Sequence, residues 1–196
     1  MKKLIVLIFA LCLLNCPTLY SQNRVRAIEG GLFVGLGSGT NKCGYKSMAV
    51  GVGLGAELRY NFQNLPIDLG IQYSLSMVNR KYEKTLYYDP DPTTRSKSSN
   101  LLLIGDYNFN RGNKVSVFVG LGTGLAKFED SAPAEESALG RVFIGDRRYS
   151  FCFMPRVGVE FFNRLRLSVE YKIEEKANSN IAFNIGFAFG GGKIKD

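Results

Sequence analysis

Arg164-Leu165-Arg166-Leu167-Ser168-Val169-Glu170-Tyr171-Lys172-Ile173-Glu174 is a segment in which polar and apolar side chains alternate without an exception. Successive side chains of a β-strand point to opposite faces of the sheet, so this period of two predicts a strand with one wholly apolar face. The direction in which that face points separates the classes of protein that the chain could form.

Seven other segments follow the same plan, with glycine at many positions of the less apolar face. We predict these strands at about residues 28–37, 48–60, 67–77, 101–109, 115–126, 149–161 and 181–189. Pro155 lies inside one of them. Because proline cannot donate a ladder hydrogen bond, we expect a bulge or a local break there.

The links between the predicted strands alternate between short and long. Tight links contain residues 63–66, 110–113 and 162–163, whereas residues 80–99 and 127–148 form long polar loops. An even number of strands with short turns at one end and long loops at the other is typical of a transmembrane β-barrel. Aromatic pairs that could form an interfacial girdle stand at the tight links: Tyr60 and Phe62, Tyr107 and Phe109, and Phe161 and Phe162.

The apolar faces could point inward, as in a soluble carrier, or outward to lipid. Facing outward, they leave glycines and charged side chains to fill the narrow interior that eight strands enclose. Turning Arg166 or Lys172 to the lipid midplane would cost about 2–4 kcal/mol each. We therefore predict an all-β, eight-stranded antiparallel up-and-down transmembrane β-barrel with a lumen filled by ion pairs. The candidates are Glu57, Arg59, Asp68, Asp106, Arg156, Glu160, Arg166, Glu170 and Lys172.

The first 22 residues have the layout of a secretory signal peptide. Lys2 and Lys3 precede an apolar run at residues 4–14, which is too short for a spanning helix. We predict cleavage near Ser21 or Gln22, which leaves residues 23–196 as one β-barrel domain. Lipid attachment at Cys16 is the competing hypothesis.

Composition narrows the function classes. The chain has no histidine, so the usual general base is missing, and we expect neither an enzyme nor a bound metal or cofactor. Removing Lys2 and Lys3 leaves 23 of the 25 basic residues against 17 acidic ones, but they form no long basic block, so we expect no nucleic-acid partner. Cys43 and Cys152 could pair in an oxidising compartment or remain two separate thiols.

The glycine-rich segments 33–37, 51–55 and 118–122, together with the hairpin at residues 156–162, resemble one family. The chain is similar to the small outer-membrane β-barrel proteins of Gram-negative bacteria, such as the OmpA membrane domain and OmpX, with features of barrels from Bacteroidota. The resemblance covers the mature chain and implies a location in the outer membrane, in contact with its lipid. Such barrels commonly end on an aromatic residue, whereas Phe189 is followed here by seven more residues, which we expect to begin as a flexible glycine tail.

Three hypotheses on function follow. The leading one is a structural or surface-interaction barrel whose long loops contact an extracellular or envelope protein, with Tyr82, Tyr87 and Tyr88 as candidate contact residues. The second is an accessory barrel of an export or assembly machine, as the PorT-like proteins of the same broad group are. The third is a soluble or lipid-anchored periplasmic carrier of an apolar ligand.

Overall fold

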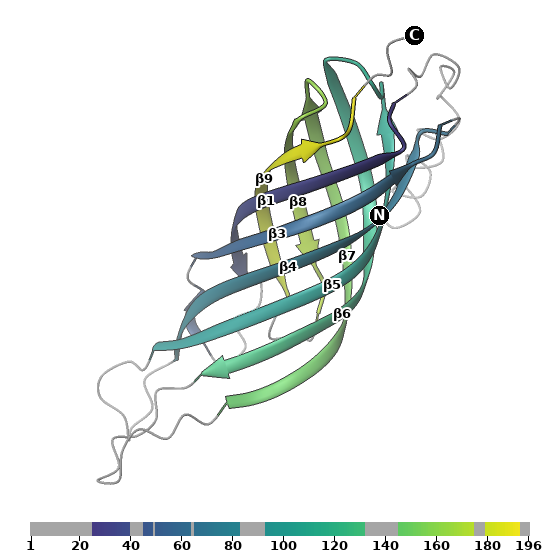
Figure 1. The fold of residues 1–196 in the computed structure, drawn as a ribbon. Helices are drawn as coiled ribbons and strands as arrows, with labels where there is room; N and C mark the ends of the chain where they lie inside the picture. Colours follow the sequence, from purple (N-terminus) through teal and green to yellow (C-terminus); the bar gives the residue numbers. More distant parts are fainter. Residues whose placement is uncertain are drawn as a thin grey trace, which may run out of the picture.

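A computed structural model of the chain describes residues 25–39, 45–48, 50–63, 65–82, 93–131, 145–174 and 179–192. The described residues form strands joined by turns (Figure 1). In this part of the chain there is no helix with the length and apolar character needed to cross a membrane. The strands are β1 (Ile28–Gly39), β2 (Tyr45–Met48), β3 (Val50–Asn61), β4 (Ile67–Tyr82), β5 (Thr93–Phe109), β6 (Val115–Ser131), β7 (Gly145–Phe161), β8 (Leu165–Lys172) and β9 (Asn180–Phe189).

The strands close into one antiparallel barrel. From β3 to β9 each strand pairs with the next one along the chain, and β1 closes the barrel by pairing with β3 on one side and β9 on the other. The short β2 pairs with β4 beyond the last β3 pair, so β2 and β3 share one position in the barrel. The prediction of an eight-stranded antiparallel barrel is therefore confirmed.

The barrel wall is much longer on one side than on the other (Figure 1). Strands β4 to β7 have 16 or 17 residues each, whereas β8 has 8 and β9 has 10. Pairing of β4 with β5 continues to Lys81↔Thr93, and pairing of β6 with β7 continues to Ser131↔Gly145. We call residues 78–82, 93–98, 127–131 and 145–150 the loop-end extension. Apart from residues 149–150, it lies outside the predicted strands and lengthens four of them at the ends where their alternation fades.

Pro155 breaks one ladder and leaves the other intact. On the β6 side the register runs through Leu121↔Pro155 without a shift. On the β8 side pairing stops at Arg156↔Glu170 and resumes at the bridge Phe153↔Ile173, whose two hydrogen bonds are 2.8 and 3.0 Å long. The local break that the sequence predicted is present, without a bulge. Proline has no backbone N–H to donate to β8, so that ladder hydrogen bond is lost.

The tightest hairpin joins β7 to β8 through two residues with positive φ. Phe162 has a φ of 55° and Asn163 a φ of 53°, and the Arg164 N–H donates to the Phe161 carbonyl at 3.0 Å. Positive φ at both central positions is the signature of a type I′ turn, whose twist matches that of the flanking strands. A phenylalanine is an uncommon choice there, because its Cβ crowds the backbone.

The two ends of the described chain meet at the turn end of the barrel. The Arg26 N–H donates to the Gly192 carbonyl at 3.1 Å, and Asn61 Nδ2 donates to the Arg26 carbonyl at 2.9 Å. Gly190 has a φ of 81°, which lets the chain turn sharply after β9. Residues 190–192 therefore lie against the barrel, while the rest of the predicted flexible tail lies outside the described residues.

Candidate functional site

On the barrel strands whose side chains the structure describes, the more apolar face points away from the lumen. Outward side chains on β1, β3, β5 and β6 illustrate this, since Leu32, Leu54, Leu101 and Leu125 are each between 54 and 62% exposed. The alternate positions face inward and hold mostly glycines and polar side chains, with a smaller number of buried apolar ones. This arrangement is the reverse of that in a soluble barrel, where the apolar side chains fill the interior.

Aromatic side chains surround the turn end. The Tyr60 and Phe62 rings lie 5.2 Å apart between centroids, and the Tyr107 and Phe109 rings lie 4.9 Å apart. At the end of β9, Phe189 is half exposed. Rings at this level are suited to the interface between hydrocarbon and lipid headgroups.

The structure places all nine predicted lumen residues inside the barrel. Eight of them are no more than 9% exposed, and the Glu160 side chain is 12% exposed. The three predicted loop contacts cannot be placed in the same way. Tyr82 is the last residue of β4, while Tyr87 and Tyr88 lie outside the described residues.

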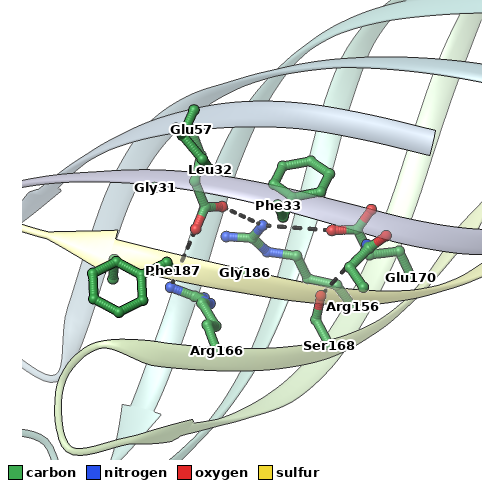
Figure 2. Close-up of a pocket in the computed structure, with 12 residues that line it drawn as sticks. Gly31, Leu32, Phe33, Glu57, Arg156, Arg166, Ser168, Glu170, Gly186 and Phe187 are labelled. Atoms are coloured by element: carbon green, nitrogen blue, oxygen red, sulfur yellow. Dashed lines mark hydrogen bonds and ion pairs between the residues drawn. The ribbon is translucent and has the colours of Figure 1, made fainter.

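Asp106 is the centre of the ion-pair network. Arg156 donates to it from Nε at 2.7 Å and from Nη2 at 2.5 Å, and Arg166 Nη2 donates to the same carboxylate. Arg156 Nη1 also donates to Glu57 Oε2 at 3.0 Å (Figure 2) and to Gln72 Oε1 at 2.9 Å. One arginine thus connects side chains from β3, β4 and β5, so the pairs tie opposite walls of the barrel together.

An aromatic ring and two glycines complete this centre. The Phe118 ring is fully buried, with the Arg166 guanidinium carbon 3.6 Å from its centroid. A Cβ added at Gly158 would lie 2.4 Å from Phe118 Cζ, and one added at Gly120 would lie 1.9 Å from Asp106 Oδ1. The glycines on the inward face therefore supply the space that the ring and the carboxylate occupy.

A second group of ions lies nearer the turn end, around Arg59. This guanidinium donates to Glu29 and lies 3.4 Å from Glu57, with Asp68 and Glu160 each 3.8 Å away. Asn108 Nδ2 donates to Asp68 at 2.8 Å. We refer to the contacts around Asp106 and Arg59 together as the turn-end network.

Arg111, in the β5–β6 turn, holds the neighbouring β3–β4 turn in place through hydrogen bonds to its backbone. Its Nη1 donates to the carbonyls of Phe62 and Leu65 at 3.1 and 3.0 Å, and its Nη2 lies 3.9 Å from Asp68. The β3–β4 turn is therefore attached to the β5–β6 turn and to the network above it. Arg111 and Val25 close the lumen at this end, and Val25 is only 4% exposed.

The lumen toward the loop end is filled differently. Gln72, which accepts from Arg156, donates from Nε2 to Glu170 at 3.3 Å and so ends the turn-end network. Farther along, Lys172 Nζ donates to Ser74 at 3.0 Å and Asn100 Nδ2 to Glu174 at 3.1 Å. Beside them lies an apolar group on β5, β6 and β7, which we call the loop-end cluster. It comprises Leu102, Ile104, Ala126, Phe128, Cys152 and Met154.

Of the two cysteines that could pair, the structure describes only Cys152. Cys152 carries a free, buried thiol, which lies 3.6 Å from Glu174 Oε1. Cys43 lies outside the described residues. Within the part of the chain that the structure covers, no three histidine, cysteine or acidic side chains are grouped so that they could hold a metal ion.

Several residues that matter in the lumen were missed from the sequence. Glu29 and Phe118 have the same alternation as the inward glycines of their strands, so the period of two would have found both. Gln72 faces inward by the same rule but carries no charge. Arg111 lies in a turn, where alternation gives no signal, and only the register of neighbouring strands brings it to Asp68.

Comparison with known proteins identifies the fold. No protein family matches the sequence, and no curated protein matches it. Neisserial surface protein A has a solved structure that superposes with a TM-score of 0.55 at 12% identity, covering 85% of this chain and 98% of that chain. OprG from Pseudomonas aeruginosa superposes with a TM-score of 0.51 at 14% identity, covering 86% and 97%. At these identities the likeness is one of fold, and the chain resembles integral outer-membrane barrels of eight strands.

Proposed function

We propose that the protein is an integral outer-membrane barrel with a filled lumen, which acts at the cell surface through its loop end. The observation that carries this proposal is the inverted distribution of side chains. A continuous belt of exposed aliphatic residues surrounds a core of buried charges. In water that belt would be a large exposed apolar surface, whereas in a bilayer it is matched by the hydrocarbon.

The filled lumen argues for a structural anchor. The side chains of the turn-end network and of the loop-end cluster occupy the interior, as an eight-stranded barrel requires. We expect planar-bilayer recordings of the natural protein to show no steady large conductance. A stable nanosiemens-scale channel would contradict the filled lumen.

The loop-end extension supports the surface role. Four strands carry the wall beyond the apolar belt, and their last described rows hold exposed side chains such as Lys97, Arg148 and Tyr149. The long links 83–92 and 132–144 leave from these strands. Long links between strands are where such folds commonly bind, so we infer that a protein partner contacts this end of the barrel.

The first experiment tests the membrane barrel. Outer-membrane barrels of this kind commonly stay folded in SDS until they are heated. We expect the membrane-fraction protein to migrate differently before and after boiling, and to resist extraction with carbonate. Extraction by carbonate without a mobility shift would instead support the carrier hypothesis.

A labelling experiment tests which end faces out. Lys97→Cys and Lys114→Cys, each in a Cys43→Ser background, place one exposed thiol at the loop end and one at the turn end. On intact cells we expect a membrane-impermeant maleimide to label the first variant only, and to label both after lysis. The reverse pattern would place the loop end in the periplasm and remove the surface role.

Three finer assignments remain predictions from the sequence. They are the signal peptide at residues 1–22, membership of the OmpA- and OmpX-like group, and an origin in Bacteroidota. We expect mass spectrometry of the protein from membranes to find a mature chain that begins near residue 23.

A further inference from the structure

The outer wall of the barrel has a hollow on the side formed by β6 to β9. Its volume is about 460 Å³, within the size range of sites that hold small organic molecules. Gly158, Ser168 and Asn184, which occupy inward positions, complete its lining. We call this hollow the outer groove. Its outward lining residues are Val117, Val157, Val159, Leu167, Val169, Phe183 and Ile185.

Short side chains produce the outer groove. Strand pairing sets Val117 opposite Val159, and Val157 opposite Val169, so four valines occupy the middle of this wall. The next outward row toward the turn end holds larger side chains on three neighbouring strands, Phe161, Leu165 and Phe187. The wall is therefore recessed on the loop-end side of this row.

Two basic residues stand just beyond that row, at the turn end. Lys114 comes before the first residue of β6, and its carbonyl accepts the Phe162 N–H at 2.7 Å. Arg164 comes before the first residue of β8. Both side chains are exposed, and neither has an ion-pair partner within the described ranges of the chain. Both can therefore hold a negative charge that comes from outside the protein.

The outer rim of the turn end carries positive charge only. The turns and chain ends described at this end, residues 25–28, 62–63, 65–66, 109–114, 161–165 and 189–192, contain no aspartate or glutamate. The one other exposed basic residue in these ranges is Arg26, because Arg111 is buried. The acids of the adjoining strands, such as Glu29 and Asp68, are buried in the lumen. A rim of this kind attracts anionic headgroups.

The spacing between the groove and the two bases matches a phospholipid. Val117 comes three residues after Lys114, and Leu167 three residues after Arg164. Three residues span roughly 10 Å along a strand, or about 7 Å along the membrane normal when the strand is tilted by about 45°. The headgroup region on each side of the hydrocarbon is about 5–8 Å thick. A lipid phosphate at the two bases would therefore have its acyl chains at the level of the groove.

We propose that the outer groove, Lys114 and Arg164 form a binding site for one anionic glycerophospholipid, with an acyl chain in the groove and the phosphate between the two bases. The inference rests on the proposed membrane barrel. The two residues lie two strand spacings apart, roughly 10 Å, so that their long side chains can reach one phosphate. An anionic headgroup is favoured over a zwitterionic one because the net charge of the headgroup decides its attraction to the positive rim.

The chain has no tryptophan, so a single introduced tryptophan can report on the lipid beside it. Phe183→Trp places this reporter in the outer groove, and Ile185→Trp is a second reporter there if the first variant fails to fold. Tyr73→Trp is the matched control, because Tyr73 is 47% exposed on β4, four strands away from β8 in either direction around the barrel.

Each purified variant is first tested for the mobility shift on boiling and then placed in vesicles of phosphatidylglycerol and phosphatidylcholine. One of the two lipids carries brominated acyl chains, which quench tryptophan fluorescence on contact. Exchanging the brominated lipid gives the ratio of the two binding constants at each tryptophan.

We expect phosphatidylglycerol to be preferred at least about fivefold at Phe183→Trp, which is the effect of one basic side chain on an anionic headgroup. At Tyr73→Trp we expect no preference. Adding Lys114→Gln and Arg164→Gln to the Phe183→Trp protein should remove the preference. Adding Lys97→Gln, which neutralises an exposed lysine at the loop end, should leave it unchanged.

An equal preference at the two walls would overturn the inference, as would a preference that survives the double substitution. Weak quenching of Phe183→Trp by both lipids, together with a crosslinked dimer, would also overturn it, because a second copy of the chain would then cover the groove. A natural protein without the mobility shift would instead count against the membrane barrel.

Discussion

The two halves of the lumen are filled by different physical means. Toward the turn end, Asp106, Arg156 and their neighbours form one connected set of buried charges, in which each arginine contacts more than one carboxylate. Toward the loop end, polar pairs stand apart and an apolar cluster occupies the remaining space. The first half depends on pairing of charge and the second on volume, so equivalent substitutions should have unequal effects in the two halves.

The largest effect is expected where the charge network loses its centre. Asp106→Ala leaves the Arg156 and Arg166 guanidinium groups without their shared carboxylate inside the barrel. Breaking a buried ion pair from one side costs about 3–5 kcal/mol. Urea unfolding in phospholipid vesicles, followed by the mobility shift, would measure the loss of unfolding free energy.

The matched control is Glu129→Ala, which removes a partly exposed carboxylate of the loop-end extension. If Asp106→Ala cost no more than removal of that surface carboxylate, the network would not be the main support of the turn-end half.

A smaller loss is expected for Met154→Ala in the loop-end cluster. Met154 is fully buried, and its truncation opens a cavity at a cost of about 2–5 kcal/mol. We expect the low end of this range, because the truncation leaves no buried charge without a partner. The same urea titration applies, and a loss larger than that of Asp106→Ala would reverse the ranking of the two halves.

Two glycines on β6 sharpen the comparison further. A Cβ at Gly120 would lie 1.9 Å from Asp106 Oδ1 and 2.7 Å from the Gly105 carbonyl, whereas a Cβ at Gly122 would meet the mobile end of Met154 at 2.9 Å. We expect Gly120→Ala to cost about 1–3 kcal/mol through overpacking, and Gly122→Ala to cost clearly less. Equal losses in the urea titration would show that the network can yield as readily as the cluster.

The smallest effect is expected outside the lumen. Lys127 Nζ and Glu129 Oε1 lie 2.7 Å apart in the loop-end extension, with both side chains about one-third exposed. Exposed ion pairs contribute about 0.2–1 kcal/mol, so Glu129→Ala should lower the unfolding free energy by no more than that. A larger loss would indicate that the extension supports the barrel as well as projecting from it.

The sequence predicted the barrel because lipid imposes the alternation that it carries. At residues 165–173 the apolar side chains face outward without exception, and this period fixes both the strand and its orientation. The alternation fades in the sequence at the ends of β4 to β7, in residues such as 78–82 and 93–98. Those strands therefore came out shorter in the prediction than in the structure.

The contents of the lumen were harder to predict. Alternation shows which side chains enter the interior, but the partners are set by the stagger between strands that are distant in sequence. Gln72 and Arg156 are separated by 84 residues, yet Arg156 Nη1 donates to Gln72 Oε1 at 2.9 Å. Large apolar residues such as Phe118 and Met154 also fill the interior, and the assumption that lumen residues are charged overlooked them.

The meeting of the two chain ends at the turn end has a consequence for protein engineering. The hydrogen bond from the Arg26 N–H to the Gly192 carbonyl brings residues 26 and 192 within the span of a short peptide linker. The order of strands around the barrel can therefore be kept while the point at which the polypeptide begins is moved. A circular permutant that joins these ends and opens the chain between β4 and β5 would preserve every pair of neighbouring strands, with both of its new termini at the opposite end of the barrel.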